Sequence, residues 1–163
     1  MPKGEKRYEC ICCCEGIEHF GNPLKFMTDA HELLEENGLF VVTTPNIWNS
    51  ASKIQFLTRG FFPGFPCLAG KIQRGTHMHI TPWSFAHLYL YLTLAGFRDI
   101  QLHEEELSKA KHFWEIPLAM PQKLYAKGKL RRAANEEELS FWEICGSPRS
   151  IYSRHLIVTA RKK

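Results

Sequence analysis

The chain has 163 residues, of which 44% are hydrophobic and 23% charged, a composition that is typical of one globular domain and excludes a disordered chain. The net charge of +4 comes from short basic clusters beside predicted elements, which favours solvated ends of helices and strands over a nucleic-acid surface. No apolar run reaches the roughly 18 residues of a membrane span.

The first predicted element is a strand at Tyr8–Cys14, which contains four of the six cysteines. No second pair of Cys or His residues stands at zinc-finger distance, so we interpret Cys12, Cys13 and Cys14 as small apolar residues of a buried central strand. The charged N-terminus has no apolar signal region, and together these features predict a reduced, cytoplasmic protein.

An ionisable turn, Glu15-Gly16-Ile17-Glu18-His19, follows this strand directly. Because ligands bind outside the carboxyl ends of parallel strands, the turn is the first candidate for a functional site. Only nine residues precede Cys10, so no glycine-rich phosphate or nucleotide turn stands before the strand. The order of features predicts the second half of an enzyme.

A helix follows the turn, with Asn22 as its N-cap and Pro23 at its first position. Apolar residues recur at helical spacing up to Asn37-Gly38, which predicts a left-handed C-cap there. A short apolar strand at Leu39–Thr43 comes next. This β-α-β order predicts two parallel, adjacent strands.

A long connection at Trp48–Ile80 carries a predicted helix at Ala51–Thr58 and an aromatic segment at Phe56–Phe65. Long connections are often lids or binding loops. Together with Trp48, the aromatic segment either covers an apolar ligand or buries itself against the aromatic region Phe113–Tyr125.

The remaining elements complete one domain, 1–163, with a core at 8–103, a helical insertion at 104–153 and a final strand at 154–160. They are a helix from Thr81 to Ala95, a strand at Phe97–His103, one or two short helices at Lys111–Lys127 broken by Pro117 and Pro121, a helix capped by Asn135 and ending near Gly146, and a strand at Arg154–Ala160.

Three blocks, at Tyr8–Asn46, His77–Phe97 and Arg154–Ala160, resemble the fourth to seventh strands of class I S-adenosylmethionine-dependent methyltransferases, closest to the ubiquinone-pathway O-methyltransferases. The resemblance implies an α/β fold with a partial Rossmann-like sheet, in which the last strand is antiparallel and lies between Leu39–Thr43 and Phe97–His103. It also implies methyl transfer from S-adenosylmethionine to an oxygen or other nucleophile of a small or lipid-like, amphiphilic acceptor.

The chain departs from this family where the cofactor is held. It contains no Gly-x-Gly-x-Gly turn and no acidic residue to hold the cofactor ribose, and Glu9 and Gly16 replace the usual Asp and Val. We therefore expect the chain to be incomplete as it stands, with one edge of its sheet uncovered. Another polypeptide supplies the missing half, or the chain self-associates; the alternative is a truncated, catalytically inert or partner-binding remnant.

The resemblance also implies site residues. Cys14 and Glu15 would lie at the cofactor, and Glu15, Glu18, His19 and His79 match the metal-binding pattern of small-RNA 2′-O-methyltransferases. Two carboxylates and two imidazoles suit Mg²⁺, Mn²⁺ or Zn²⁺. The alternative is that Glu18 and His19 cap the next helix and that His79 only packs.

Three further roles remain open in the sequence. His19 alone is a candidate general base. His77 and His79 alternate along an extended segment, so only one faces the site, and His79 is the candidate that also binds substrate. Asn46 follows the second strand and either binds substrate or caps a turn.

Overall fold

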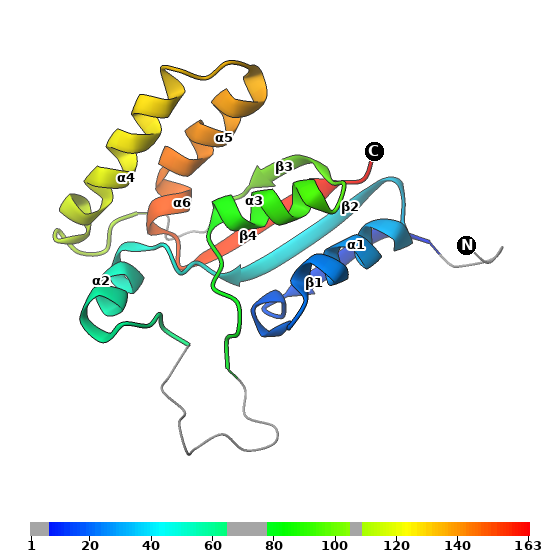
Figure 1. The fold of residues 1–163 in the computed structure, drawn as a ribbon, viewed down its shortest axis with the longest axis horizontal. Coiled ribbons are helices and arrows are strands. Elements are labelled where there is room, and N and C mark those ends of the chain that lie inside the picture. Colours follow the sequence, from blue (N-terminus) through cyan, green and yellow to red (C-terminus); the bar gives the residue numbers. More distant parts are fainter. Residues whose placement is uncertain (1–6, 65–77, 105–108) are drawn as a thin grey trace.

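A computed structural model describes residues 7–64, 78–104 and 109–163. Figure 1 shows a twisted sheet with α1 and α3 side by side over one face, and α4 and α5 packed as a pair beyond its end. The elements are β1 (Tyr8–Cys14), a 3-10 turn η1 (Ile17–His19), α1 (Pro23–Leu33), β2 (Leu34–Pro45), α2 (Ser50–Arg59), α3 (Phe85–Leu94), β3 (Arg98–Leu102), α4 (Glu115–Leu130), α5 (Glu136–Gly146), α6 (Pro148–Tyr152) and β4 (His155–Arg161).

The sheet confirms the predicted topology. Its strand order is β1-β2-β4-β3, with β1 parallel to β2 and with β4 antiparallel to both of its neighbours. Cys14 pairs with Thr43 at the carboxyl ends of β1 and β2. Among the described residues, β1 has a neighbour on one side only, so it is an edge strand.

The two faces of the sheet differ in burial. Phe40, Val42 and Val158 are fully buried beneath the helices. On the opposite face Cys10, Cys12 and Cys14 are exposed, and only Cys13 of β1 is buried. The interpretation of Cys12 and Cys14 as buried residues of a central strand is therefore wrong, because side chains alternate along an edge strand and every second one points to the open face.

The first helix ends earlier than predicted, at Leu33. Leu34 is fully buried and extended, it pairs with Tyr8, and its carbonyl accepts a hydrogen bond from Lys162 Nζ at 2.9 Å. Asn37 is left-handed, with φ of 63°, but it lies within β2, where its N–H donates to the Lys162 carbonyl. Sheet pairing therefore outweighs the local helix-stop signal.

Two other helices differ from their predicted bounds. α3 begins later than predicted, at Phe85, where Ser84 caps it by accepting a hydrogen bond from the His87 N–H, while Thr81 lies in the preceding segment and its N–H donates to the Glu18 carbonyl. α4 is one continuous helix that contains Pro121, while Pro117 lies in the first turn, where N–H groups need no helical partner. The Asn22 and Asn135 caps are confirmed. Within the described part of the chain, no helix is both long and apolar enough to cross a membrane.

Candidate functional site

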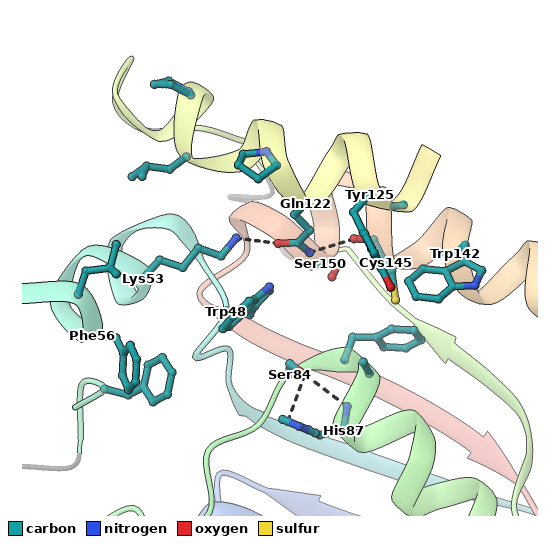
Figure 2. A pocket seen from close by; sticks show the side chains of 18 residues that line it. Trp48, Lys53, Phe56, Ser84, His87, Gln122, Tyr125, Trp142, Cys145 and Ser150 are labelled. Carbon is teal, nitrogen blue, oxygen red and sulfur yellow. Dashed lines mark hydrogen bonds between the residues drawn. The ribbon is translucent and has the colours of Figure 1, made fainter. Parts of the chain in front are cut away.

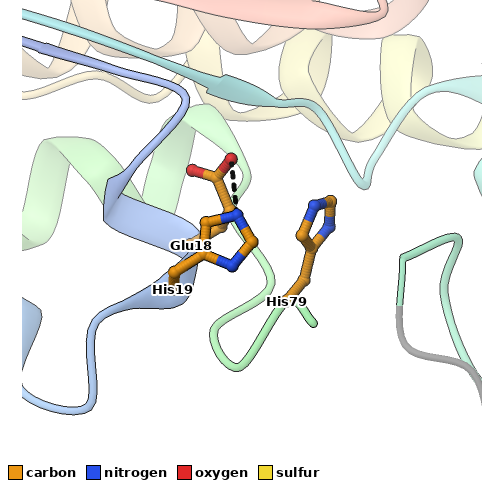
Figure 3. Close-up of side chains that lie close together, drawn as sticks. All are labelled: Glu18, His19 and His79. Atoms are coloured by element: carbon orange, nitrogen blue, oxygen red, sulfur yellow. Dashed lines mark ion pairs between the residues drawn. The ribbon is translucent and has the colours of Figure 1, made fainter. Parts of the chain in front are cut away.

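Two features lie at the carboxyl end of β2. One is an apolar cavity whose wall begins at Trp48, just after the strand (Figure 2). The other is a cluster of Glu18, His19 and His79, in which the side chains face one another across two segments of the chain (Figure 3). We refer to these three residues as the ionisable cluster.

The turn after β1 places the first two members of the cluster. Glu15 takes up a left-handed conformation, with φ of 47°, and its N–H donates to the carbonyl and to Oγ1 of Thr43 at 3.0 and 3.2 Å. These bonds hold the end of β1 against β2 while the chain turns into η1. Glu18 and His19 are consequently presented at the carboxyl edge of the sheet.

Glu18 is a buried carboxylate with defined partners. Its side chain is almost completely shielded from solvent, and Oε2 accepts a hydrogen bond from Thr44 Oγ1 at 2.9 Å. Its backbone carbonyl accepts from the N–H groups of Ile80 and Thr81 at 2.7 and 3.0 Å. These two bonds fasten the segment that carries His79 to the turn that carries Glu18.

The three side chains could share one ion. Each offers a ligand atom, and these atoms all lie within 4.8 Å of one another. His19 Nε2 lies 3.8 Å from Glu18 Oε1, and the rings of His19 and His79 are 5.1 Å apart, edge to face. The part-exposed histidines and the buried carboxylate form the kind of mixed nitrogen and oxygen ligand set that binds divalent transition metals.

A backbone contact fixes the tautomer of His19. Its Nδ1 lies 2.8 Å from the Met78 carbonyl oxygen, which can only accept a hydrogen bond. Nδ1 therefore carries the proton in the neutral ring, and Nε2, on the side of Glu18, carries the lone pair. That nitrogen is suited to bind a cation or to accept a proton.

Other predicted site residues lie elsewhere. Glu15 Oε2 is 4.0 Å from His155 Nε2 and is not part of the ionisable cluster, while Cys14 is exposed at the end of β1. Asn46 is buried, and its Nδ2 donates to the carbonyls of Ser150 and Ser153 at 2.9 and 3.0 Å. Its Oδ1 accepts from the Trp48 N–H, which favours the turn-capping alternative. His77 lies outside the described residues.

Two contributors to this region, Thr44 and the carbonyl of Met78, have no recognisable signal in the sequence. Both act through contacts between segments far apart in the chain: Thr44 Oγ1 reaches Glu18 across 26 positions and His19 reaches Met78 across 59. A partly buried ion pair likewise has no sequence signal: Arg154 Nη2 donates to Glu115 Oε1 at 3.0 Å, and Nη1 donates to Asn49 Oδ1 at 2.7 Å. It ties α4 to the segments at the ends of β2 and β4.

Known proteins resemble the chain over much of its length. A family described as a methyltransferase domain matches residues 1–102. The ubiquinone biosynthesis O-methyltransferases of Rickettsia canadensis and Rickettsia akari are 23% and 22% identical over 114 residues, or 70% of this chain. Those residues are 46% and 43% of the two relatives, so the chain spans about half the length of the curated relatives it matches.

Solved structures share the fold. An S-adenosylmethionine-dependent methyltransferase from Archaeoglobus fulgidus matches with a TM-score of 0.51 and 16% identity, over 97% of this chain and 61% of that protein. A second such enzyme, from Thermotoga maritima, matches with a TM-score of 0.50 and 11% identity, over all of this chain and 60% of that protein.

The sequence lacks one of the elements expected to hold S-adenosylmethionine. Cys14 and Glu15 lie at the end of β1, which pairs on one side only among the described residues, and the sequence has no two glycines separated by a single residue that could hold the methionine portion of the cofactor. Because the family match covers residues 1–102 and the sheet has the order that the resemblance implies, this chain belongs to the methyltransferase-domain family, of the class I S-adenosylmethionine-dependent type.

Proposed function

We propose that this chain forms the acceptor side of a methyltransferase that transfers a methyl group from S-adenosylmethionine to an oxygen of a small or lipid-like molecule. The observation that carries the proposal is the ionisable cluster at the carboxyl end of β1. In α/β folds this is the edge at which ligands bind. The names of the two curated relatives, both O-methyltransferases, support an oxygen as the nucleophile.

In this proposal Glu18, His19 and His79 hold a divalent cation. One carboxylate and two imidazoles suit Zn²⁺ or Mn²⁺ better than Mg²⁺, which prefers oxygen ligands. A cation held there would bind the acceptor hydroxyl and lower its pKa. Thr44 keeps the Glu18 carboxylate in position by donating a hydrogen bond to Oε2.

His19 also provides a route that needs no metal. Its Nε2 carries the lone pair, so it can take the proton of an acceptor hydroxyl as a general base. Glu18 Oε1, 3.8 Å away, would then stabilise the imidazolium that forms. The two routes use the same nitrogen and therefore exclude one another.

The cofactor-binding strands, in our proposal, come from polypeptide outside these 163 residues, in a longer chain or in a partner, and pair along the outer edge of β1. The exposed face with Cys10, Cys12 and Cys14 supports this arrangement, because an uncovered sheet face and a free edge favour association. Self-association of the chain would use the same edge. The second candidate, an inert partner-binding remnant, is favoured by the missing glycine-rich turn.

Metal binding is tested by thermal unfolding with and without Mn²⁺ or Zn²⁺. Binding to the folded state raises the melting temperature, and Glu18→Gln or His79→Ala should abolish that rise. Glu15→Gln is the matched control, since it neutralises a carboxylate in the same turn but outside the cluster. An equal rise in all four proteins would contradict the metal site and leave His19 as a lone base.

Cofactor binding separates the two candidates. Calorimetric titration of S-adenosylmethionine into the 163-residue chain should show weak binding or none, because the groups that hold the sulfonium and ribose are missing. A longer chain or partner that restores the first strands should bring binding into the micromolar range. Restored strands that form a stable complex without cofactor binding would favour the inert remnant.

A further inference from the structure

An apolar cavity of about 960 Å³ lies between α2, the start of α3, α4 and α5 (Figure 2). Aromatic and aliphatic side chains form most of its wall, including Phe56, Phe62, Phe85, Leu118 and Trp142. Its size is that of a site for a small molecule rather than of a packing defect. None of these residues takes part in the ionisable cluster.

The side chain of Lys53 brings an ammonium group to the cavity wall. Lys53 Nζ donates to Gln122 Oε1 at 2.7 Å and lies 5.1 Å from the centre of the Trp48 ring. Gln122 Nε2 in turn donates to the Cys145 carbonyl at 3.0 Å, which keeps its oxygen directed toward Lys53. The amide and the indole are both neutral, so neither balances the charge.

The electrostatics of the cavity favour an anion. Burial lowers the pKa of Lys53 to about 8, so the side chain is still mainly protonated at neutral pH. No Asp or Glu occurs among the described residues that line the cavity. An acidic group beside Lys53 would gain a charge-assisted hydrogen bond next to a mostly apolar wall.

We infer that this cavity binds an apolar molecule with one acidic group, which pairs with Lys53 while the apolar body lies between α2 and α4. Only the further step, that this molecule is the methyl acceptor, rests on the proposed function. Two short stretches of the chain join the cavity to the ionisable cluster. One runs from Thr44, whose hydroxyl donates to Glu18, to Trp48 of the cavity wall. The other runs from Thr81, whose N–H donates to the Glu18 carbonyl, to Ser84 of the wall.

Two pairs of probes separate the apolar from the acidic requirement. 1-Anilinonaphthalene-8-sulfonate and neutral N-phenyl-1-naphthylamine share their rings, and dodecanoate and dodecanol, used as competitors, share their chain. Lys53→Met, which keeps an apolar side chain, should lower the affinity for the two anions about tenfold and change the affinity for the two neutral molecules less than twofold. Lys53→Arg should keep anion binding.

Ala86→Trp is designed to fill the cavity from an exposed position on α3 and should abolish binding of all four molecules. Lys25→Met, on the exposed surface of α1, is the matched control for loss of a lysine and should bind like the wild type. Circular dichroism confirms that each variant is folded before it is titrated.

Three results would overturn the inference: no binding of either fluorescent probe by the wild type, equal weakening of anionic and neutral molecules by Lys53→Met, or unchanged binding in folded Ala86→Trp. These titrations need neither metal nor cofactor. A negative result here would therefore leave the metal-dependent rise in melting temperature intact, and the reverse also holds.

Discussion

The two faces of the sheet are built from the same strands but are in different environments. Phe40, Val42 and Val158 are fully buried beneath α1 and α3, whereas their neighbours Val41 and Thr159 are only partly covered. A doubly wound sheet buries both faces, so the pattern of burial here is that of a sheet completed on one side. Substitutions on the helix-covered face should therefore cost more stability than substitutions at neighbouring positions on the open face.

The largest loss of stability should come from truncating a buried side chain on the face that the helices cover. Phe40→Ala removes a ring that stacks on Phe97 with centroids 5.1 Å apart, and we expect it to cost about 3–5 kcal/mol of unfolding free energy. Val41→Ala, one position away on the open face, should cost roughly 1 kcal/mol, since its side chain is only partly removed from water. Urea unfolding at constant m-value measures both. Equal costs would show that both faces are covered.

Labelling of the cysteines compares the exposure of the two faces of the sheet without changing a core residue. In a Cys67→Ser background, Cys10, Cys12 and Cys14 should be labelled by a thiol reagent in the native protein, and Cys13 and Cys145 only after unfolding. Burial raises the pKa of Cys13 to about 11 and that of Cys145 to about 12, so these two thiols form little thiolate. Mass spectrometry at pH 8 counts the labels. Protection of all five cysteines in the native state would mean that self-association covers the open face.

Thr43 and Thr44 are adjacent in β2 and lie on opposite faces of the sheet, beside the ionisable cluster. Thr44→Val removes the hydrogen bond to the buried Glu18 carboxylate and should cost about 1.5–3 kcal/mol. Thr43→Val removes only a bond to the Glu15 N–H, which also donates to the Thr43 carbonyl, and should cost less than about 0.5 kcal/mol. Chemical denaturation ranks the pair. A larger cost for Thr43→Val would reverse the assignment of faces.

The smallest effect is a dependence on pH. Burial, and next the charge of Lys162, lower the pKa of His31, whose ring packs edge to face on Phe97 at 5.0 Å. A lowered pKa means that the unfolded state binds the proton more readily, so stability is lost as the pH falls through the unfolded pKa, about 6.5. Wild type should lose more stability than His31→Gln between pH 7.5 and 5.5. Parallel curves for the two proteins would contradict this.

Local signals predicted the parts of the fold that local chemistry controls. Asn22 and Asn135 each accept a hydrogen bond from the backbone three residues on, as expected from sequence alone. The end of α1 could not be predicted in this way, because Leu34 is drawn into the sheet by Tyr8 and Lys162, which lie far from it in sequence. A continuous α4 likewise required its packing against α5.

The residues of the candidate site could be predicted from the sequence, but most of their contacts could not. Glu18 and His19 stand out in the sequence because they follow a strand directly, and His79 was added by family resemblance. Glu15 carries the same chemistry but points toward His155, a consequence of its left-handed backbone that residue type alone does not reveal. The pairing of Lys53 with Gln122 joins positions 69 apart and depends on how α2 packs against α4.

The position of β4 constrains how this chain can be made. β4 lies between β2 and β3, yet all of α4, α5 and α6 are synthesised after β3 and before β4. At about 5–20 residues per second, the ribosome leaves β2 and β3 without their shared neighbour for several seconds. During that interval Phe40 and Val42 lack the strand that completes their surroundings. Dependence on chaperones should therefore be greatest in nascent chains that have not yet reached His155.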